Sequence, residues 1–245
     1  MALTETDLSK INGVVARMRE SRRLFVITGA GISVDSRLPT YRGVTGLYTT
    51  GTTEEGISIE EALSGDTLVE NPALSWKYIA QLEEKCRGAS FNRGHEVISG
   101  MEPEFESVTV LTQNIDGFHH AAGSTSVIDI HGDIHNLMCT ACGWRDEVAD
   151  YAGLDIPPVC PSCGEIVRPD VVLFGEMLPY DKLDLIMDAW DSGVDMVFSI
   201  GTTSVFPYIA QPVVHANRRR IPTVEINPGD TEVSMYIDYL SLIHI

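Results

Sequence analysis

The sequence is poor in lysine and has no long apolar run. Only four of its 17 basic residues are lysine, against 35 acidic residues, and the formal net charge is −18. Such an acidic surface repels a phosphate backbone, so we expect no nucleic-acid partner, whereas a basic peptide would be attracted. No apolar run approaches the roughly 18 residues of a membrane-spanning helix, so we expect no membrane partner. The acidity also suits a salt-rich habitat, so by itself it says little about the substrate.

Secretory features are missing as well. Residues 1–23 contain no apolar stretch followed by a small-residue cleavage site, so they do not resemble a signal peptide, and we expect a cytoplasmic protein. Cysteine is scarce, with five residues, four of them in two CxxC pairs. In a reducing compartment this spacing favours a metal site over disulfides.

What the sequence does contain is a series of short apolar runs typical of an α/β fold. Apolar residues at helical spacing over 8–18 precede a predicted strand at 24–28, which ends in a glycine turn. Further strands are predicted at 108–112, 127–130, 171–174, 196–200 and 223–226. This pattern indicates a doubly wound, mostly parallel, Rossmann-like sheet with helices on both faces. Polar residues follow several of these strands, at the edge where such sheets bind ligands.

Two segments interrupt the alternation of strands and helices. Residues 36–100 are long for one crossover, and we expect a mobile loop over 43–56 and helices near 58–64 and 72–86. Residues 135–170 hold the paired cysteines and read as a small inserted module. We therefore predict a large domain from 1–134 and 171–245, with 36–100 as its loop and helical insertion, and a module at 135–170.

The two CxxC pairs predict a structural zinc site. They are Cys139 with Cys142 and Cys160 with Cys163, separated by 17 residues. Four thiolates complete a tetrahedral site and leave no open position for catalysis. A redox dithiol and a nucleic-acid-binding ribbon are the rival interpretations, and the net acidity argues against the second. Cys86 lies in a helical stretch and is expected to pack as a small apolar residue.

The first glycine turn departs from the dinucleotide-binding fingerprint. Gly29 and Gly31 match its first two glycines, but Val34 stands where the third is required. No acidic residue follows at the distance expected for binding a ribose. A dehydrogenase that transfers a hydride is therefore not favoured.

Eight motifs nevertheless occur in one order along the chain. They are Gly29–Ser33, Pro39–Gly43, Thr112–Gly117, Ile130–Gly132, the two CxxC pairs taken together, Phe174–Glu176, Gly201–Ser204 and Ile226–Asn227. Together they resemble the sirtuin family of NAD-dependent protein deacylases, over about residues 23–234. The resemblance implies that the chain leaves the Rossmann path after Gly31 to form a cofactor loop, so that a third glycine is not needed.

The resemblance also implies an NAD-binding site in the large domain. It places Gly29, Ala30 and Gly31 beside the pyrophosphate, Tyr41 and Arg42 beside the nicotinamide ribose and diphosphate, Gln113, Asn114 and Asp116 at the nicotinamide end, and Gly201, Thr202, Ser204 and Asn227 on the adenosine side. Backbone amides at a helix start suit phosphate, and an amide with a carboxylate suits a carboxamide. Taken alone, residues 114–116 also read as a plain turn.

His131 is the candidate base, with Asn114 as a second catalytic residue. A lone histidine at a strand end is more often structural, but His131 matches the catalytic histidine of the family, and an imidazole accepts protons near neutral pH. The implied reaction transfers the acetyl group of acetyl-lysine to ADP-ribose and releases nicotinamide, with His131 deprotonating a ribose hydroxyl. His119 and His120 are expected to pack or to face solvent.

The resemblance also implies a binding site for the substrate peptide. Val171, Phe174, Gly175 and Glu176 match the segment that pairs with an acetylated lysine peptide, so acetylated proteins or peptides are the expected partners. A buried core strand is the alternative interpretation of this segment.

Three features depart from the family pattern. Arg37 stands where a glycine is usual, which is unfavourable if the turn needs a positive φ. Ile79 and Leu82 stand where sirtuins that accept succinyl or malonyl groups carry a tyrosine and an arginine, which predicts neutral acyl groups, although Tyr78 lies one position away. In the family, a loop that covers the adenine and a closing helix follow the position of Asn227. Neither is recognisable in this sequence, which predicts low stability or weak NAD binding.

Two alternatives to a deacetylase follow. One is a sirtuin-like ADP-ribosyltransferase or a deacylase for longer chains. The other is a binding module for NAD or peptide with weak catalysis, consistent with Arg37 and with the short C-terminal region.

Overall fold

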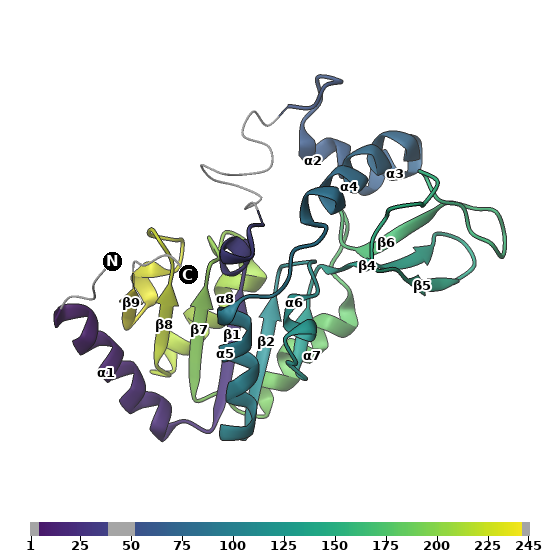
Figure 1. Cartoon of the computed structure of the whole chain (residues 1–245). Helices are drawn as coiled ribbons and strands as arrows, with labels where there is room; N and C mark the ends of the chain where they lie inside the picture. Colours follow the sequence, from purple (N-terminus) through teal and green to yellow (C-terminus); the bar gives the residue numbers. More distant parts are fainter. Residues whose placement is uncertain (1–4, 39–51, 242–245) are drawn as a thin grey trace.

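A six-stranded parallel sheet forms the core of the larger lobe in the computed structural model, which describes residues 5–38 and 52–241 (Figure 1). Its strand order is β3-β2-β1-β7-β8-β9, and all neighbours are parallel. The strands are β1 (Arg23–Thr28), β2 (Ser107–Thr112), β3 (Val127–Asp129), β7 (Met196–Ile200), β8 (Thr223–Ile226) and β9 (Tyr239–Ser241). This order is that of a Rossmann sheet, in which the order of the strands, not their direction, reverses between β1 and β7.

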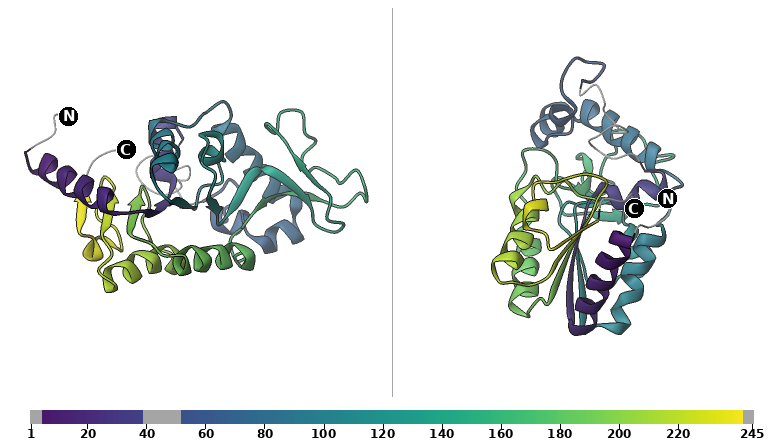
Figure 2. Two further views of the ribbon diagram at one scale, coloured as in Figure 1. Left: turned by 90° about the horizontal axis from the view of Figure 1, so that it is seen from below. Right: turned by 90° about the vertical axis from the view of Figure 1, so that its left-hand side faces the viewer.

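Helices cover both faces of this sheet (Figure 2). Helices α1 (Glu5–Glu20) and α5 (Arg93–Met101) pack on one face, and α7 (Tyr180–Asp191) and α8 (Pro207–Arg218) on the other. Strand β1 serves both layers because its side chains alternate: Leu24 and Val26 join the core under α1 and α5, and Phe25 and Ile27 join the core under α7 and α8. The predicted doubly wound fold is confirmed.

A second, smaller sheet lies beside the first. It has the antiparallel order β5-β4-β6, with β4 (Gly132–Cys139) between β5 (Arg145–Glu147) and β6 (Val167–Val171). Helices α2 (Ile59–Ala62), α3 (Gly65–Glu70) and α4 (Pro72–Cys86) pack against it around Trp76. Trp76 is fully buried and donates from Nε1 to the Val167 carbonyl at 2.9 Å. Helices α2, α3 and α4 therefore share one core with the cysteine module. The bounds of the two domains remain a prediction.

Short elements complete the described chain. They are η1 (Ala30–Ser36), η2 (Glu102–Glu104), α6 (Phe118–Ala121) and η3 (Ser234–Tyr236). No helix in the described ranges combines the length and apolar character that crossing a membrane requires.

One predicted strand is wrong. The strand expected at 171–174 instead ends at Val171, because its residues from Val167 onward pair with β4 in the small sheet. Beyond it the chain turns: Phe174 donates to the Leu63 carbonyl, and its own carbonyl accepts from Gly65. Strands β4, β5 and β9 were not predicted. The two predicted helices of the insertion are present, the first as α2.

Candidate active site and cysteine cluster

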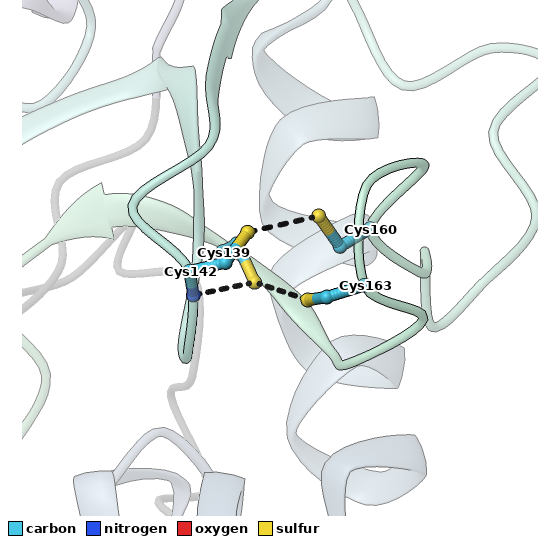
Figure 3. A group of neighbouring side chains, drawn as sticks. All are labelled: Cys139, Cys142, Cys160 and Cys163. Carbon is cyan, nitrogen blue, oxygen red and sulfur yellow. Dashed lines mark hydrogen bonds between the residues drawn. The ribbon is translucent and has the colours of Figure 1, made fainter.

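The four paired cysteines meet at the end of β4, where Cys139 is the last residue of the strand (Figure 3). Their sulfur atoms all lie within 4.8 Å of one another, with Cys139 and Cys163 at 3.5 Å and Cys142 and Cys160 at 3.6 Å. A tetrahedral zinc site with Zn–S bonds of about 2.3 Å places its sulfurs about 3.8 Å apart, so the group fits a Zn²⁺ ion. All four predicted metal ligands are brought together.

Backbone amides support the thiolate form that zinc requires. The amides of Ala141 and Cys142 donate to Cys139 Sγ at 3.3 and 3.5 Å, and they lower the pKa of Cys139. The amide of Ser162 donates to Cys160 Sγ at 3.4 Å. Since the closed set of four ligands leaves no open position, the cluster stabilises the module and carries no catalysis.

The predicted cofactor residues converge where the neighbouring strands β1, β2 and β7 end. Gln113, which follows β2, donates from Nε2 to Thr202 Oγ1 beyond β7 at 2.7 Å. Asn114 donates from Nδ2 to the Gly29 carbonyl beyond β1 at 3.2 Å. The side chains of one loop thus tie the other two loops together, and three predicted groups of residues form one polar edge.

Glycine allows the β1 and β7 loops to touch. A Cβ atom on Gly31 would lie 2.5 Å from the Cα of Gly201, and the Gly31 amide donates to the Gly201 carbonyl at 2.8 Å. The Gly29 amide donates to Ile200 in a similar way. Both amides are already hydrogen-bonded within the chain, so they do not donate to a pyrophosphate in this structure. The two glycines contribute to the predicted site through the shape of the turn. After it, η1 replaces the long helix of a Rossmann unit, which explains the absent third glycine.

Ser33 contacts the predicted site residue Asp116, although Ser33 itself was not predicted from the sequence. Its hydroxyl donates to Asp116 Oδ2 at 2.7 Å, and the Phe118 amide donates to the other carboxylate oxygen at 3.1 Å. Burial raises the pKa of Asp116, although these two hydrogen bonds oppose the shift. Its place inside the quoted Gly29–Ser33 motif was the signal that could have identified it.

The predicted adenosine side includes a buried hydroxyl without a partner. Ser204 is fully buried, and in the described residues its Oγ has no hydrogen bond. Nearby, Asn227 donates from Nδ2 to the Thr202 carbonyl at 2.7 Å. An unpaired buried hydroxyl is costly, and a polar ligand would satisfy it. The predicted residues Tyr41 and Arg42 lie outside the described residues.

His131 follows β3 and is held through both ring nitrogens. Its Nδ1 lies 2.9 Å from the Gln113 carbonyl, and its Nε2 lies 2.6 Å from the Tyr208 hydroxyl. A carbonyl only accepts, so Nδ1 carries the proton and Nε2 presents its lone pair. Burial lowers the pKa of His131, and the bond to Gln113 only partly opposes this. The imidazole is therefore a neutral base at neutral pH. Tyr208 was not predicted.

The predicted peptide segment begins directly beside His131. Val172 donates its amide to the His131 carbonyl at 2.9 Å. Further along, Glu176 accepts from Arg168 Nη2 and from the Leu173 amide, both at 2.8 Å. Burial opposes them, but these bonds hold the pKa of Glu176 below its usual range. The Glu176 carboxylate therefore shapes the turn after β6.

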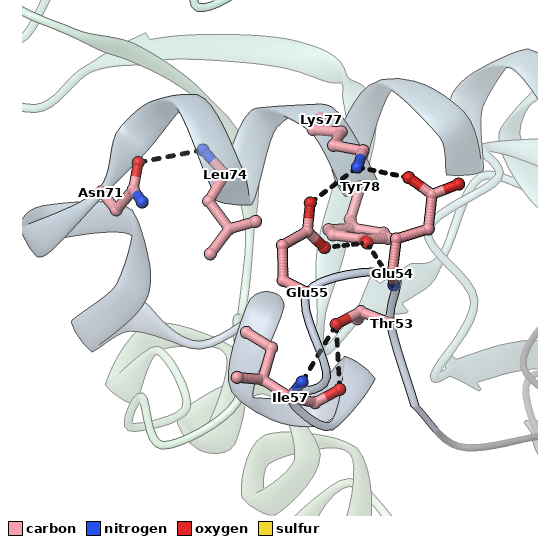
Figure 4. Close-up of polar contacts among 8 residues, drawn as sticks. All are labelled: Thr53, Glu54, Glu55, Ile57, Asn71, Leu74, Lys77 and Tyr78. Atoms are coloured by element: carbon pink, nitrogen blue, oxygen red, sulfur yellow. Dashed lines mark hydrogen bonds and ion pairs between the residues drawn. The ribbon is translucent and has the colours of Figure 1, made fainter.

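Lys77 and Tyr78 of helix α4 point toward the loop that precedes α2 (Figure 4). Tyr78 is buried, and its hydroxyl donates to the carboxylate of Glu55. Lys77 pairs with Glu55 at 2.7 Å and with Glu54 at 2.8 Å. The Lys77 and Tyr78 donors lower the pKa of Glu55 to about 2. Ile79 is buried in the apolar core, so this turn of α4 presents no free cation to a carboxylate.

Known proteins share this fold and these motifs. Residues 29–207 match the Sir2 family. A Pseudomonas aeruginosa protein named NAD-dependent protein deacylase 2 is 46% identical over 238 residues, covering 94% of this chain and 91% of the relative. A Caldanaerobacter subterraneus protein named NAD-dependent protein deacylase 1 is 39% identical over 218 residues, covering 89% of this chain and 87% of the relative.

Solved structures agree with the sequence matches. A Sir2 homologue in complex with NAD superimposes with a TM-score of 0.83 at 33% identity, covering 95% of this chain and 88% of that chain. A mutant Sir2 homologue in complex with ADP-ribose gives a TM-score of 0.85 at 32% identity, covering 95% of this chain and 90% of that chain. The chain belongs to the Sir2 family, and the resemblance drawn from its motifs is confirmed.

Proposed function

We propose that this protein is an NAD-dependent lysine deacetylase that transfers the acetyl group of acetyl-lysine to ADP-ribose. The observation that carries the proposal is the neutral His131, whose Nδ1 bonds the carbonyl of Gln113 in the polar edge, so that Nε2 carries the lone pair of a base. The names of the relatives support NAD as the co-substrate and a protein as the acyl donor.

The residues of the polar edge fit an NAD molecule. The unpaired hydroxyl of buried Ser204 is a group that a nucleotide would use. NAD supplies an activated ribose carbon with nicotinamide as the leaving group. Asn114 and Asp116 would orient the nicotinamide end, and Thr202, Ser204 and Asn227 the adenosine end. His131 would take a proton from a ribose hydroxyl at Nε2.

The segment after β6 would hold the peptide. An extended peptide would lie along this segment, and the walls contributed by Val171 and Phe174 would enclose the lysine stem. The carboxylate of Glu55 and the buried Ile79 favour a neutral acyl group over an acidic one. The formal charge of −18 favours peptides with basic residues around the modified lysine.

The test is mass spectrometry of an acetyl-lysine peptide incubated with the protein, with and without NAD. We expect an NAD-dependent loss of one acetyl group together with nicotinamide release. His131→Ala should reduce the rate by at least about a hundredfold, because the base is lost. His120→Ala is the matched control, since His120 is exposed, and it should retain the rate.

Other products would contradict the proposal. Transfer of ADP-ribose to protein without loss of acetyl would indicate an ADP-ribosyltransferase. NAD binding by the folded, zinc-loaded protein without nicotinamide release would indicate a binding module.

A further inference from the structure

The reacting nitrogen of His131 already has a hydrogen-bond partner. Tyr208 Oη lies 2.6 Å from Nε2, and the phenol is the donor because Nδ1 holds the imidazole proton against the Gln113 carbonyl. Burial raises the pKa of Tyr208 to about 12, so the phenol keeps its proton at neutral pH. A neutral histidine has one lone pair at Nε2, so it accepts from one donor at a time.

The position of the phenol is set by its surroundings. Tyr208 is the second residue of α8, a helix that begins at Pro207 and buries Ile209 in the core. The Phe206 ring stacks on Tyr208 with centroids 5.5 Å apart and planes 13° apart. Both rings meet His131 edge to face, at 88° and 81°. Helix and stacking together direct the hydroxyl at the imidazole.

Charged side chains near the histidine are bound elsewhere. Asp116 after β2 bonds Ser33, Asp129 of β3 pairs with Lys182 of α7, and Asp133 of β4 pairs with His135. The titratable group that α8 places at the His131 ring is Tyr208 itself. The phenol is thus the side chain that acts on Nε2 directly.

We propose that Tyr208 is a positioning residue that holds His131 neutral and oriented until a substrate hydroxyl replaces the phenol at Nε2. The proposal rests on the proposed function, in which Nε2 receives the proton of a ribose hydroxyl. In that step the O–H bond of the substrate breaks and the Nε2–H bond forms, while the phenol keeps its own proton. Helix α8 thereby sets the protonation of a base carried by a different strand end.

The first test reads the histidine itself, without turnover. The pKa of His131 is measured by NMR titration of histidine-labelled protein, with His131→Asn assigning the signal. A donor at Nε2 stabilises the neutral ring, so Tyr208→Phe should raise the pKa of His131 by about 0.5 to 1 unit. Phe206→Leu should give a smaller rise. Tyr180→Phe, on the exposed part of α7, is the matched control and should give none.

The second test is the pH profile of kcat/KM. In Tyr208→Phe the acid limb should move to higher pH by the same amount, and kcat on the alkaline plateau should stay within about threefold of the wild-type value. An unchanged pKa and an unmoved limb would overturn the proposal. So would a loss of about a hundredfold on the plateau, because the phenol would then be passing the proton.

The two proposals fail separately. If the wild-type protein shows no NAD-dependent deacetylation but the pKa of His131 still rises in Tyr208→Phe, the proposed function is wrong and the coupling between Tyr208 and His131 stands. If deacetylation occurs and the pKa does not move, the role of Tyr208 is wrong and the function stands.

Discussion

Arg37 occupies a backbone conformation that favours glycine. Its φ of 65° and ψ of 18° lie in the left-handed region, at the C-terminal end of η1. The conflict was expected from the sequence, because Arg37 stands where the sirtuin pattern described above places glycine. A non-glycine residue there is strained by about 1 to 2 kcal/mol.

Replacing the arginine should therefore stabilise the protein. We expect Arg37→Gly to raise the free energy of unfolding by about 0.5 to 1 kcal/mol, measured by urea denaturation, since relief of strain exceeds the added freedom of the unfolded chain. Arg17→Gly, inside α1, should instead lower it by about 1 kcal/mol. A loss of stability in Arg37→Gly would show that the arginine side chain makes a compensating contact.

At the scale of elements, an ion pair shapes the end of β6. Arg168 of β6 binds the Glu176 carboxylate and also donates to the Val171 carbonyl at 2.7 Å. The pair closes the turn that would hold the peptide, so its effect on function should appear in peptide binding.

Removing the charge of Glu176 should therefore weaken peptide binding selectively. We expect Glu176→Gln to raise the KM for the acetylated peptide by about three- to tenfold, through the weaker bond to Arg168, with little change in the KM for NAD. Glu70→Gln, at the exposed end of α3, is the matched control. Equal changes in both KM values would contradict this assignment.

Two buried histidines connect α5, α6 and β1. The rings of His95 and His119 lie 4.9 Å apart, and His119 Nε2 lies 2.9 Å from Thr28 Oγ1. Burial lowers the pKa of His95 to about 4 and of His119 to about 3. Both stay neutral in the folded protein, whereas in the unfolded chain they bind protons below about pH 6.5.

Stability should therefore fall as the pH drops below 6.5. Between pH 7 and pH 5 the unfolded chain gains protons that the folded protein excludes, which lowers the free energy of unfolding by about 2 kcal/mol for each histidine. We expect His95→Gln to lose about 2 kcal/mol of this pH dependence in urea denaturation, whatever its stability at pH 7. His120→Gln should keep the full dependence. An unchanged dependence in His95→Gln would show that the pair is not the cause.

At the scale of the whole molecule, the zinc module and the helical insertion depend on each other. Trp76 of α4 contacts Tyr151 of the module at a ring distance of 5.4 Å and bonds the Val167 carbonyl. The small sheet and the three helices therefore have a common core, distinct from the two layers of the parallel sheet.

Loss of zinc should consequently loosen both parts. In hydrogen exchange, we expect chelation or Cys163→Ser to reduce the protection of α4 amides by at least about tenfold, while β1, β2 and β7 remain protected. Added Zn²⁺ should restore protection after chelation. Cys86→Ser, outside the cluster, is the matched control. Protection of α4 that survives zinc loss would contradict a shared core.

The amino-acid sequence alone determined the elements and motifs that depend on local chemistry. The apolar runs at 24–28, 196–200 and 223–226 became strands, because short buried runs between turns have few alternatives. The CxxC spacing identified all four members of the sulfur cluster, because two residues between ligands suit a metal. The ordered motifs identified the family.

Only the tertiary structure decided what depends on segments far apart in the chain. It joined α4 to the cysteine module, ended β6 at Val171 by pairing it with β4, and placed Tyr208 against His131, 77 residues away. Local patterns carry no information about such partners, because a side chain can be directed at any group that folding brings within reach. The motif around His131 was sufficient to select it as a candidate base, whereas its hydrogen-bond partners could be identified only in the folded structure.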